Sequence, residues 1–301
     1  MNHYIEFPRL GWKFALDPTL VEFGAFSIKW YGVLIAVGFL LAVLYGMHRA
    51  KDFDLNADKM MDTALLTTLV AFVGARLYYV LFSGRLSEYL ANPLSILQVW
   101  NGGLGIYGGI IFAFVFGFLF SRLFKVSFLS MADIASLGFL IGQAVGRWGN
   151  FFNQEAFGGN TDLSWGMTGD IIASGVNGEG YSTYLPVHPT FLYESLWCIL
   201  GFVLLHILSK HLYKFKGQIF CCYLMWYGCG RFLIESVRTD SLMLGTMRVS
   251  QLVAIAAVLG GGILLLVLRR RANSLPKDLL AAEIPVETEI QEEEPKNGNE
   301  N

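Results

Sequence analysis

Seven long apolar runs, separated by shorter polar segments, organise most of this 301-residue chain. Each run approaches the roughly 20 residues that a helix needs to cross a bilayer. We expect membrane-spanning helices at about 26–47, 60–82, 104–120, 131–150, 190–208, 218–237 and 249–268. The pattern therefore predicts an all-α polytopic membrane protein with seven transmembrane helices.

The polar segments divide the chain further. Residues 1–25 predict an extracytoplasmic, interfacial N-terminal segment, followed by helices one to four over 26–150. Residues 151–189 contain no Lys or Arg and are rich in Gly, Ser, Asn and Thr, which predicts a small extracytoplasmic cap between spans four and five. Helices five to seven then occupy 190–268, and the acidic tail at 269–301 is expected to be disordered.

Composition agrees with a membrane location. The chain is 54% hydrophobic and 15% charged, with a mean hydropathy of +0.49. A soluble domain usually carries about 25% charged residues. The sequence has no HExxH motif, no CxxC pair and no Walker loop, so it predicts no metal ion and no other cofactor.

Lysines and arginines are distributed unevenly along the chain. Most of them lie in the segments 48–59, 121–130 and 209–217 and after residue 268. The positive-inside rule places these segments in the cytoplasm. We therefore expect the N-terminus and the cap outside and the C-terminus in the cytoplasm.

Glycines form a regular stripe in the fourth run. Gly138, Gly142 and Gly146 recur every four residues, and small residues at this spacing let a neighbouring helix approach closely. Arg147 follows the last glycine, and Asn150 lies on the same helix face. An arginine in this position holds either an anionic ligand or a structural ion pair.

Three arginines lie within the apolar runs, namely Arg76, Arg147 and Arg231. A charge at the centre of a membrane helix costs about 2.5–3.5 kcal/mol on insertion scales, so each must face protein or water. Arg147 and Arg231 lie toward the outer halves of their runs, where two guanidiniums can clamp the oxygens of a lipid phosphate. The alternative is structural pairing with the outer-half carboxylates, which are Glu155, Glu194 and Glu235.

One face of the sixth run collects further polar residues. Tyr227, Arg231, Glu235 and Arg238 follow one another at i, i+4, i+8 and i+11. This face either forms a structural ion pair between Arg231 and Glu235, with Arg238 at the interface, or contributes to a ligand site.

Four other residues have two interpretations each. Asn150 and Asn153 are donors to a head group or helix-end caps. His188 is a site residue or an ordinary polar residue at the membrane interface. Tyr107, which lies in a Gly-flanked segment, is an interfacial aromatic or a site residue.

A long ordered motif carries a specific resemblance. GRWGNFFNQEAFG (146–158) resembles the signature of prolipoprotein diacylglyceryl transferases, the membrane enzymes that lipidate bacterial lipoproteins. Five further segments extend the resemblance over nearly the whole chain before the tail: WYG (30–32), GARLYYVLF (74–82), VWNGGLGIYGG (99–109), HPTFLYE (188–194) and YGCGRFLIESVR (227–238).

The resemblance implies an activity and its partners. The expected reaction, which begins bacterial lipoprotein maturation, transfers the diacylglyceryl group of phosphatidylglycerol to the lipobox cysteine thiol of a preprolipoprotein. Its products are a thioether and glycerol 1-phosphate. The implied partners are phosphatidylglycerol, the preprolipoprotein signal peptide and the lipid bilayer of the bacterial plasma membrane, with no cofactor and no nucleic acid.

The resemblance also implies roles for single residues. Arg147 and Arg231 match essential arginines and are expected to be catalytic. Tyr107 stands where many members have a histidine that has been proposed as the base. A tyrosine, with a pKa near 10, is a poor base at neutral pH but can donate a hydrogen bond to a phosphate oxygen. The expected contacts to phosphatidylglycerol are Arg147, Asn150, Asn153, Glu155, Tyr31, Tyr227, Glu235, Arg238 and His188.

Two other functions use the same arginines. A transporter for an anionic solute would use them as a gate, and it would be expected to show paired repeats and broken helices. We find no convincing repeat in the sequence. A lipid-binding scaffold without catalysis is the third hypothesis.

Overall fold

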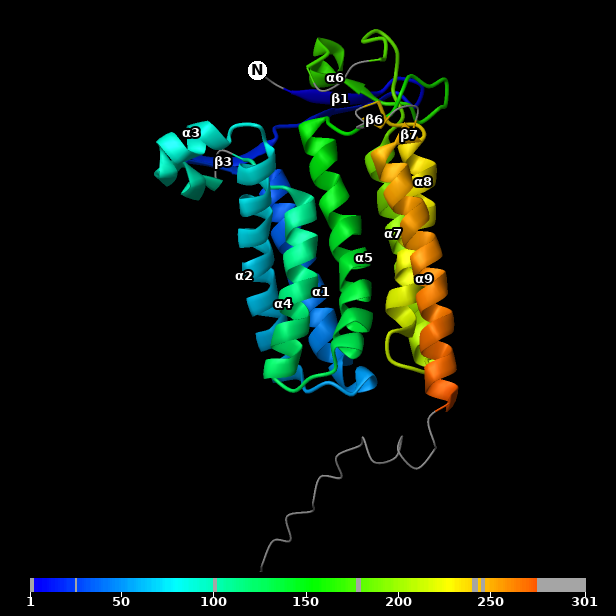
Figure 1. Cartoon of the computed structure of the whole chain (residues 1–301). Helices are drawn as coiled ribbons and strands as arrows, with labels where there is room; N and C mark the ends of the chain where they lie inside the picture. The colour runs from blue at the N-terminus through cyan, green and yellow to red at the C-terminus, as the bar shows by residue number, and fades with distance from the viewer. Residues whose placement is uncertain are drawn as a thin grey trace, which may run out of the picture.

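Long helices run side by side in the computed structural model, which describes residues 3–24, 26–99, 102–176, 180–239, 243–244 and 247–274 (Figure 1). They form a bundle, with a small cap at one end. The long helices are α1 (Trp30–Arg49), α2 (Ala57–Phe82), α4 (Ile106–Leu123), α5 (Phe128–Asn153), α7 (Thr190–His211), α8 (Gln218–Glu235) and α9 (Val249–Ser274).

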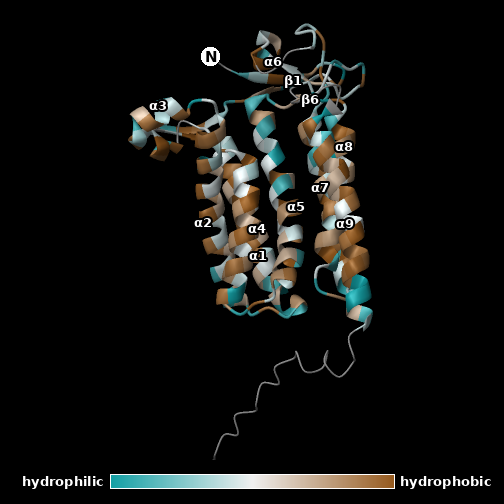
Figure 2. Ribbon diagram, viewed as in Figure 1, coloured by the Kyte–Doolittle hydropathy of each residue, from teal (hydrophilic) through white to brown (hydrophobic). Residues whose placement is uncertain are grey.

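Six helices in the described part of the chain are long and apolar enough to cross a membrane. They are α1 with the short 3-10 helix η1 (Ala50–Phe53), α2, α4, α5, α7 and α9. The expected span at 218–237 coincides with α8, which lies beside α7 and α9 but is less apolar because it carries Gln218, Arg231 and Glu235. Figure 2 shows hydrophobic residues along the bundle and hydrophilic residues gathered at its ends.

Short strands show that the all-α expectation was wrong. β1 (Tyr4–Phe7) pairs antiparallel with β2 (Trp12–Ala15) and with β5 (Thr168–Gly169). β3 (Thr19–Phe23) pairs with β4 (Phe26–Lys29), so the first helix begins at Trp30, four residues later than expected. Another pair precedes α9 and consists of β6 (Met243–Leu244) and β7 (Met247–Arg248). Strands of two to five residues are too short to compete with the helical pattern in the sequence.

A side arm follows α2. It consists of α3 (Leu86–Ala91) and the 3-10 helix η2 (Pro93–Leu97), and it projects sideways near the cap end of the bundle (Figure 1). Pro93 begins η2 at a position where its missing N–H is not needed. The arm lies inside the region that the sequence assigned to the first four helices.

The cap and the bundle share one apolar core. Ile5 and Phe7 of β1 are buried together with Val187, Phe151 and Phe191, which belong to the cap loop and the ends of α5 and α7. The α6 helix (Asp170–Ser174) adds Ile172 to the same core. The described residues of the segment 151–189 are therefore folded onto the helix ends.

Gln154 ties the end of α5 to the cap. It has a left-handed backbone with φ at 48°, and its side chain is fully buried. Its Nε2 donates to Tyr4 O at 3.1 Å and to Asp170 Oδ1 at 2.9 Å, while its Oε1 accepts from Ile171 N at 3.1 Å. One amide thus joins α5, β1 and α6.

The glycine stripe allows the close helix contact that its spacing predicted. A Cβ atom on Gly38 of α1 would lie 3.2 Å from Gly142 Cα, so the two backbones almost touch. Gly138 faces Ala42 of α1 in the same way, whereas Gly146 has open space where its Cβ would be. The stripe therefore packs α5 against α1 and leaves the helix less crowded before Arg147.

The C-terminal part of the chain is only partly described. The α9 helix continues to Ser274, beyond the expected end at residue 268. Of the tail that was expected to be disordered (269–301), residues 269–274 belong to α9 instead, and residues 275–301 lie outside the described residues, as do Ala25, Trp100 and Asn101.

Candidate functional site

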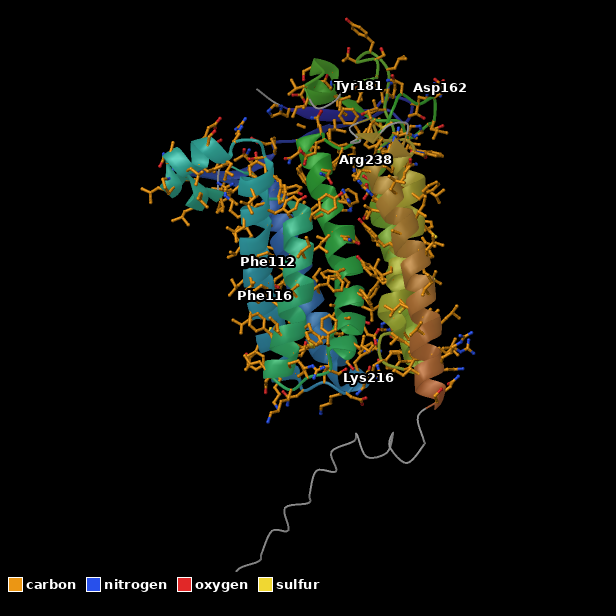
Figure 3. The ribbon with its side chains drawn as sticks, in the orientation of Figure 1. Phe112, Phe116, Asp162, Tyr181, Lys216 and Arg238 are labelled. Atoms are coloured by element: carbon orange, nitrogen blue, oxygen red, sulfur yellow. The ribbon has the colours of Figure 1, made fainter. Side chains whose placement is uncertain are left out.

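Three arginines from different parts of the chain meet at one carboxylate. Arg147 near the end of α5 places Nη2 at 2.5 Å from Glu194 Oε2. Arg231 of α8 and Arg238, just after α8, approach Glu194 Oε1 at 3.6 and 3.3 Å. Figure 3 labels Arg238 where the helices meet the cap. The structure thus brings Arg147 and Arg231 into one site through a shared partner on α7.

A second carboxylate completes this group. Glu235 is 1% exposed and lies one turn after Arg231, with Oε2 at 2.7 Å from Arg231 Nη2. That contact lies outside hydrogen-bond geometry, so the pair is held mainly by charge. The described group therefore combines three guanidiniums with two carboxylates. We call this group the arginine cluster, and its members are Arg147, Glu194, Arg231, Glu235 and Arg238.

The guanidiniums of the cluster remain partly accessible. The side chain of Arg147 is 27% exposed and that of Arg231 is 19% exposed, whereas Glu194 is 11% exposed. Arg147 and Arg231 are therefore more open than Glu194, whereas Arg238 is as buried as that carboxylate. An anion approaching the cluster would meet N–H donors before it met carboxylate oxygens.

An amide relay extends the cluster along α5. Arg147 Nη1 donates to Asn150 Oδ1 at 3.3 Å, and Asn150 Nδ2 donates to Glu155 Oε1 at 3.0 Å. Asn153 Nδ2 donates to the same oxygen at 3.1 Å. The helix itself ends on the backbone N–H of Gln154. Both asparagines therefore hold Glu155 with their side-chain amides, and the relay links that carboxylate to Arg147.

Backbone hydrogen bonds fix the three helix ends around the cluster. Gly158 N donates to His188 O at 3.0 Å, and Gly159 N donates to Val237 O at 2.8 Å. A Cβ atom on Gly158 would lie 2.7 Å from Val237 O, so only glycine fits there without a shift. The loop after α5 thereby joins the entry to α7 and the exit from α8.

His188 belongs to this support rather than to the cluster. Its Nδ1 lies 3.1 Å from Tyr193 Oη, and Tyr193 Oη also accepts from Trp165 Nε1 at 2.9 Å. Burial lowers the pKa of His188 below its usual value and favours the neutral ring. The contact with Tyr193 involves no member of the cluster, so the expected role of His188 toward the lipid stays a prediction.

The three expected tyrosines have different positions. Tyr31 of α1 packs against the backbone of Gly149, where any Cβ would clash with its ring. Tyr227 lies one turn before Arg231 and stacks on Tyr223. Tyr107, at the start of α4, is 41% exposed and pairs with Tyr78 of α2 at a centroid distance of 6.1 Å. Within the described residues, no hydrogen bond or ring contact connects Tyr107 with the arginine cluster.

The third intramembrane arginine lies in a different environment. Arg76 donates from Nε to Ile96 O at 2.8 Å and from Nη2 to Ser95 O at 2.9 Å. Its Nη1 donates to Gly102 O and Gly103 O, both at 2.8 Å. Arg76 therefore organises the side arm and the loop before α4.

An apolar groove lies directly below the arginine cluster. It is a cavity of about 270 Å³ between α5 and α7, lined by apolar side chains and Ser195. Ala144, Val145 and Trp148 on its α5 wall surround the position of Arg147 in the sequence, and Ser195 follows Glu194. The groove therefore offers apolar space next to the cationic group.

Sequence reasoning missed two of the organising residues. Glu194 was counted among the possible partners of the arginines, but its contact with all three was not expected. Gln154 lies between Asn153 and Glu155 in the signature motif and received no role. In the sequence, the available signal was its amide side chain just beyond the expected end of the fourth apolar run.

Comparisons with known proteins agree with the motifs. Residues 18–267 match the profile of the family described as prolipoprotein diacylglyceryl transferase. The chain is 44% identical over 250 residues to the phosphatidylglycerol–prolipoprotein diacylglyceryl transferase of Lysinibacillus sphaericus, covering 82% of this chain and 90% of the relative. The enzymes of that name from Streptococcus agalactiae (40% over 262 residues, 86% and 98% covered) and Limosilactobacillus reuteri (41% over 268 residues, 87% and 94% covered) are similarly related. The chain therefore belongs to the prolipoprotein diacylglyceryl transferase family.

Proposed function

We propose that this protein transfers the diacylglyceryl group of phosphatidylglycerol to the lipobox cysteine thiol of preprolipoproteins. The relatives carry the name of this activity. The observation that supports it most directly is the convergence of Arg147, Arg231 and Arg238 on Glu194. Lipoprotein maturation at the bacterial plasma membrane begins with this transfer.

The reaction exchanges one bond for another at a glycerol carbon. The thiolate sulfur forms a C–S bond, the C–O bond to phosphate breaks, and its electron pair stays on the departing glycerol 1-phosphate. The thiol proton passes to solvent. A free thiol has a pKa of about 8.5, and a positive field raises the fraction of thiolate.

The arginine cluster supplies that field and receives the leaving group. Charge accumulates on the phosphate oxygens as the C–O bond breaks, and fixed donors stabilise this charge more than that of the phosphodiester. Glu194 holds Arg147 and Arg231 in place before the lipid arrives. Tyr107 donates a hydrogen bond in this scheme and is not the base. The remaining contacts to the head group come from the expected lipid-binding residues.

The apolar groove accommodates the acyl chains of the donor lipid. Its α5 wall runs from Leu140 to Trp148, a stretch that includes the position of Arg147, and α7 bounds it through Ile199 and Phe202. A head group at the arginine cluster therefore has apolar space directly beneath it. This arrangement favours a lipid over a soluble anion and argues against a transporter.

The cluster lies near the outer leaflet if α8 is also a span, which makes seven spans in all. The cap is then extracytoplasmic, with the N-terminus outside and the C-terminus in the cytoplasm. Figure 3 shows Lys216 at the end of the bundle opposite Asp162 of the cap, which supports this orientation under the positive-inside rule. A topology reporter fused after residue 274 should report a cytoplasmic location, and an external location would refute the orientation.

One assay tests the proposed reaction. Purified protein is mixed with phosphatidylglycerol and a lipobox peptide, and release of glycerol phosphate is measured. We expect release only with the cysteine peptide and not with a matched peptide in which serine replaces that cysteine. A transporter or scaffold would release none with either peptide, and that result would overturn the proposal.

A further inference from the structure

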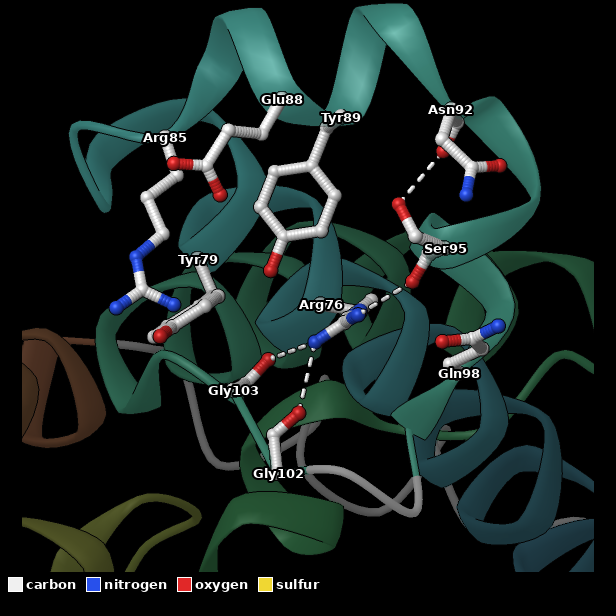
Figure 4. A pocket seen from close by; sticks show the side chains of 10 residues that line it. All are labelled: Arg76, Tyr79, Arg85, Glu88, Tyr89, Asn92, Ser95, Gln98, Gly102 and Gly103. Carbon is white, nitrogen blue, oxygen red and sulfur yellow. Dashed lines mark hydrogen bonds between the residues drawn. The ribbon is translucent and has the colours of Figure 1, made fainter.

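A second cationic cavity lies outside the arginine cluster. It has a volume of about 340 Å³ and is enclosed by the end of α2, the side arm and the loop before α4 (Figure 4). Polar groups dominate its lining, and it shares no residue with the cluster or with the apolar groove. This volume lies at the lower end of the range for small-molecule pockets, which is about 300–1,000 Å³.

Arg76 gives this cavity a buried positive charge. Arg76 is 7% exposed, and four of its five N–H donors bind carbonyl oxygens, so that one N–H on Nη2 has no partner among the described residues. Within the described residues, no carboxylate lies within ion-pair distance of Arg76. Carbonyl dipoles orient the guanidinium but do not cancel its charge. The cavity therefore favours an anionic occupant.

The other polar groups suit a phosphate that carries hydroxyl groups. Arg85 places a second guanidinium on the wall, and Tyr79 and Tyr89 provide phenolic hydroxyls. Figure 4 shows the Tyr89 hydroxyl directed toward Arg76, with Glu88 between Arg85 and Tyr89. Two cations outnumber the single carboxylate, whose oxygens can accept hydrogen bonds from ligand hydroxyls. A phosphoglycerol group presents both features.

The surroundings of the cavity favour a lipid as the source of this group. Leu90, Leu94 and Leu97 of the side arm are 69%, 72% and 68% exposed. Leucines exposed at the end of an apolar helix bundle are at the level of the lipid head groups, where apolar side chains enter the interface. A lipid head group can thus reach the cavity without leaving the bilayer.

We propose that this cavity binds the phosphoglycerol head group of an anionic lipid, as a second lipid site separate from the arginine cluster. Arg85 and the remaining Arg76 donor hold the phosphate, and Glu88 accepts from the glycerol hydroxyls. The site goes beyond the transfer reaction, because binding here does not require the lipobox peptide or turnover.

A photoreactive lipid tests this proposal. The full-length protein is placed in nanodiscs that contain phosphatidylglycerol or phosphatidylcholine, each with the same diazirine-bearing acyl chain, and labelled peptides are mapped by mass spectrometry. We expect several-fold more labelling of residues 86–98 by phosphatidylglycerol than by phosphatidylcholine. Equal labelling by the two lipids would overturn the proposal.

Variants of exposed residues then identify the groups responsible. Arg85→Gln should remove most of the preference for phosphatidylglycerol, whereas Glu88→Gln should increase labelling by any phosphate lipid and reduce the preference for glycerol. Arg269→Gln, which removes an exposed arginine from α9, is the matched control and should change nothing. An unchanged preference in Arg85→Gln would contradict the assignment.

Soluble competitors distinguish the two sources of the head group. Glycerol phosphate and inorganic phosphate are added separately at millimolar concentration during labelling. We expect neither to abolish the preferential labelling, because a membrane-held lipid has a high local concentration. If glycerol phosphate abolished it, the occupant would be the free compound, and the lipid assignment would be wrong.

Discussion

The arginine cluster and Arg76 stabilise buried guanidinium groups with different kinds of partner. Both place guanidiniums at the cap end of an apolar bundle, where a lone charge is unfavourable. Arg147 pairs with Glu194 of another helix, and Arg231 pairs with Glu194 and with Glu235 of its own helix. Arg76 is surrounded by backbone carbonyls of its own neighbourhood.

The choice of partner decides what each arginine can do. Carboxylates offset most of the charge in the arginine cluster and hold three helix ends together, while partly exposed N–H groups remain for a ligand. Carbonyls use up four donors of Arg76 and so fix a loop, but they leave its charge intact. The comparison predicts that changes in the cluster affect chemistry and that changes at Arg76 affect local order.

The largest effect should come from Arg231. Arg231→Ala should abolish measurable transfer, with a loss of at least about 100–1,000-fold, because an aimed donor to the leaving group is removed. Arg231→Lys should recover little, since the bidentate fork is lost. Glycerol phosphate release by the purified variants measures the loss, and lipidation in a deletion strain provides the independent check. Robust lipidation by the alanine variant would contradict the mechanism.

Substitution of Glu194 should cause the second-largest loss of transfer activity. Glu194→Gln keeps the shape of the side chain but removes the charge that holds Arg147, Arg231 and Arg238. We expect transfer to fall by about tenfold or more, because the guanidiniums then repel one another and lose their fixed geometry. The kinetic assay should show a lower kcat. A variant with unchanged kcat and KM would show that the shared contact has no part in positioning.

Substitution of Arg76 should reduce stability more than transfer activity. Arg76→Gln leaves several carbonyls of residues 95–103 without their donor, and each lost hydrogen bond weakens stability by about 0.5–1.5 kcal/mol. We expect a lower thermal unfolding temperature and faster hydrogen exchange in residues 95–99, with transfer reduced far less than in Arg231→Ala. Arg122→Gln, at an exposed helix end, is the control. If Arg76→Gln kept normal stability but abolished transfer, Arg76 would have a chemical role and the comparison with the arginine cluster would be wrong.

Tyr107 should have a smaller effect on rate. Tyr107→Phe should reduce transfer by less than about tenfold, which is the scale of one neutral hydrogen bond. Tyr107→His should be tolerated. Its exposed position beside Tyr78 agrees with a supporting role. A loss as large as that of Arg231→Ala would instead identify Tyr107 as indispensable.

Substitution of Asp170 should have the smallest effect, which is a loss of local stability confined to the cap. Burial raises its pKa, but hydrogen bonds from Gln154, His3 and the Tyr4 N–H outweigh this and lower the pKa below its usual value. The ionised form therefore stabilises the cap above about pH 4, and that contribution is lost as the pH falls through the folded-state pKa. Asp170→Asn at neutral pH should speed hydrogen exchange of β1 a few-fold without changing α7. Unchanged exchange would show that the charge is irrelevant.

Periodicity and the placement of charges predicted much of this arrangement. The positions of Arg147 and Arg231 in the outer halves of their runs indicated a common site; both contact Glu194, and their role toward a lipid stays a prediction. The contact of three helices at Glu194 could not be predicted from the sequence, because contacts between distant segments depend on how the helices pack together. The same holds for Arg76, since backbone carbonyls carry no sequence signal. The strand β1 was too short for its alternating Ile5 and Phe7 to stand out.

The pairing of β1 with β5 has a consequence for biosynthesis. Ile5 and Gly169 are registered partners, although most of the bundle separates them along the chain. During translation, the first strand has no partner on this side until the ribosome has passed α5, which is the fourth long helix. The pairing of β1 with β5 in the cap can therefore form only after the first four long helices have been synthesised.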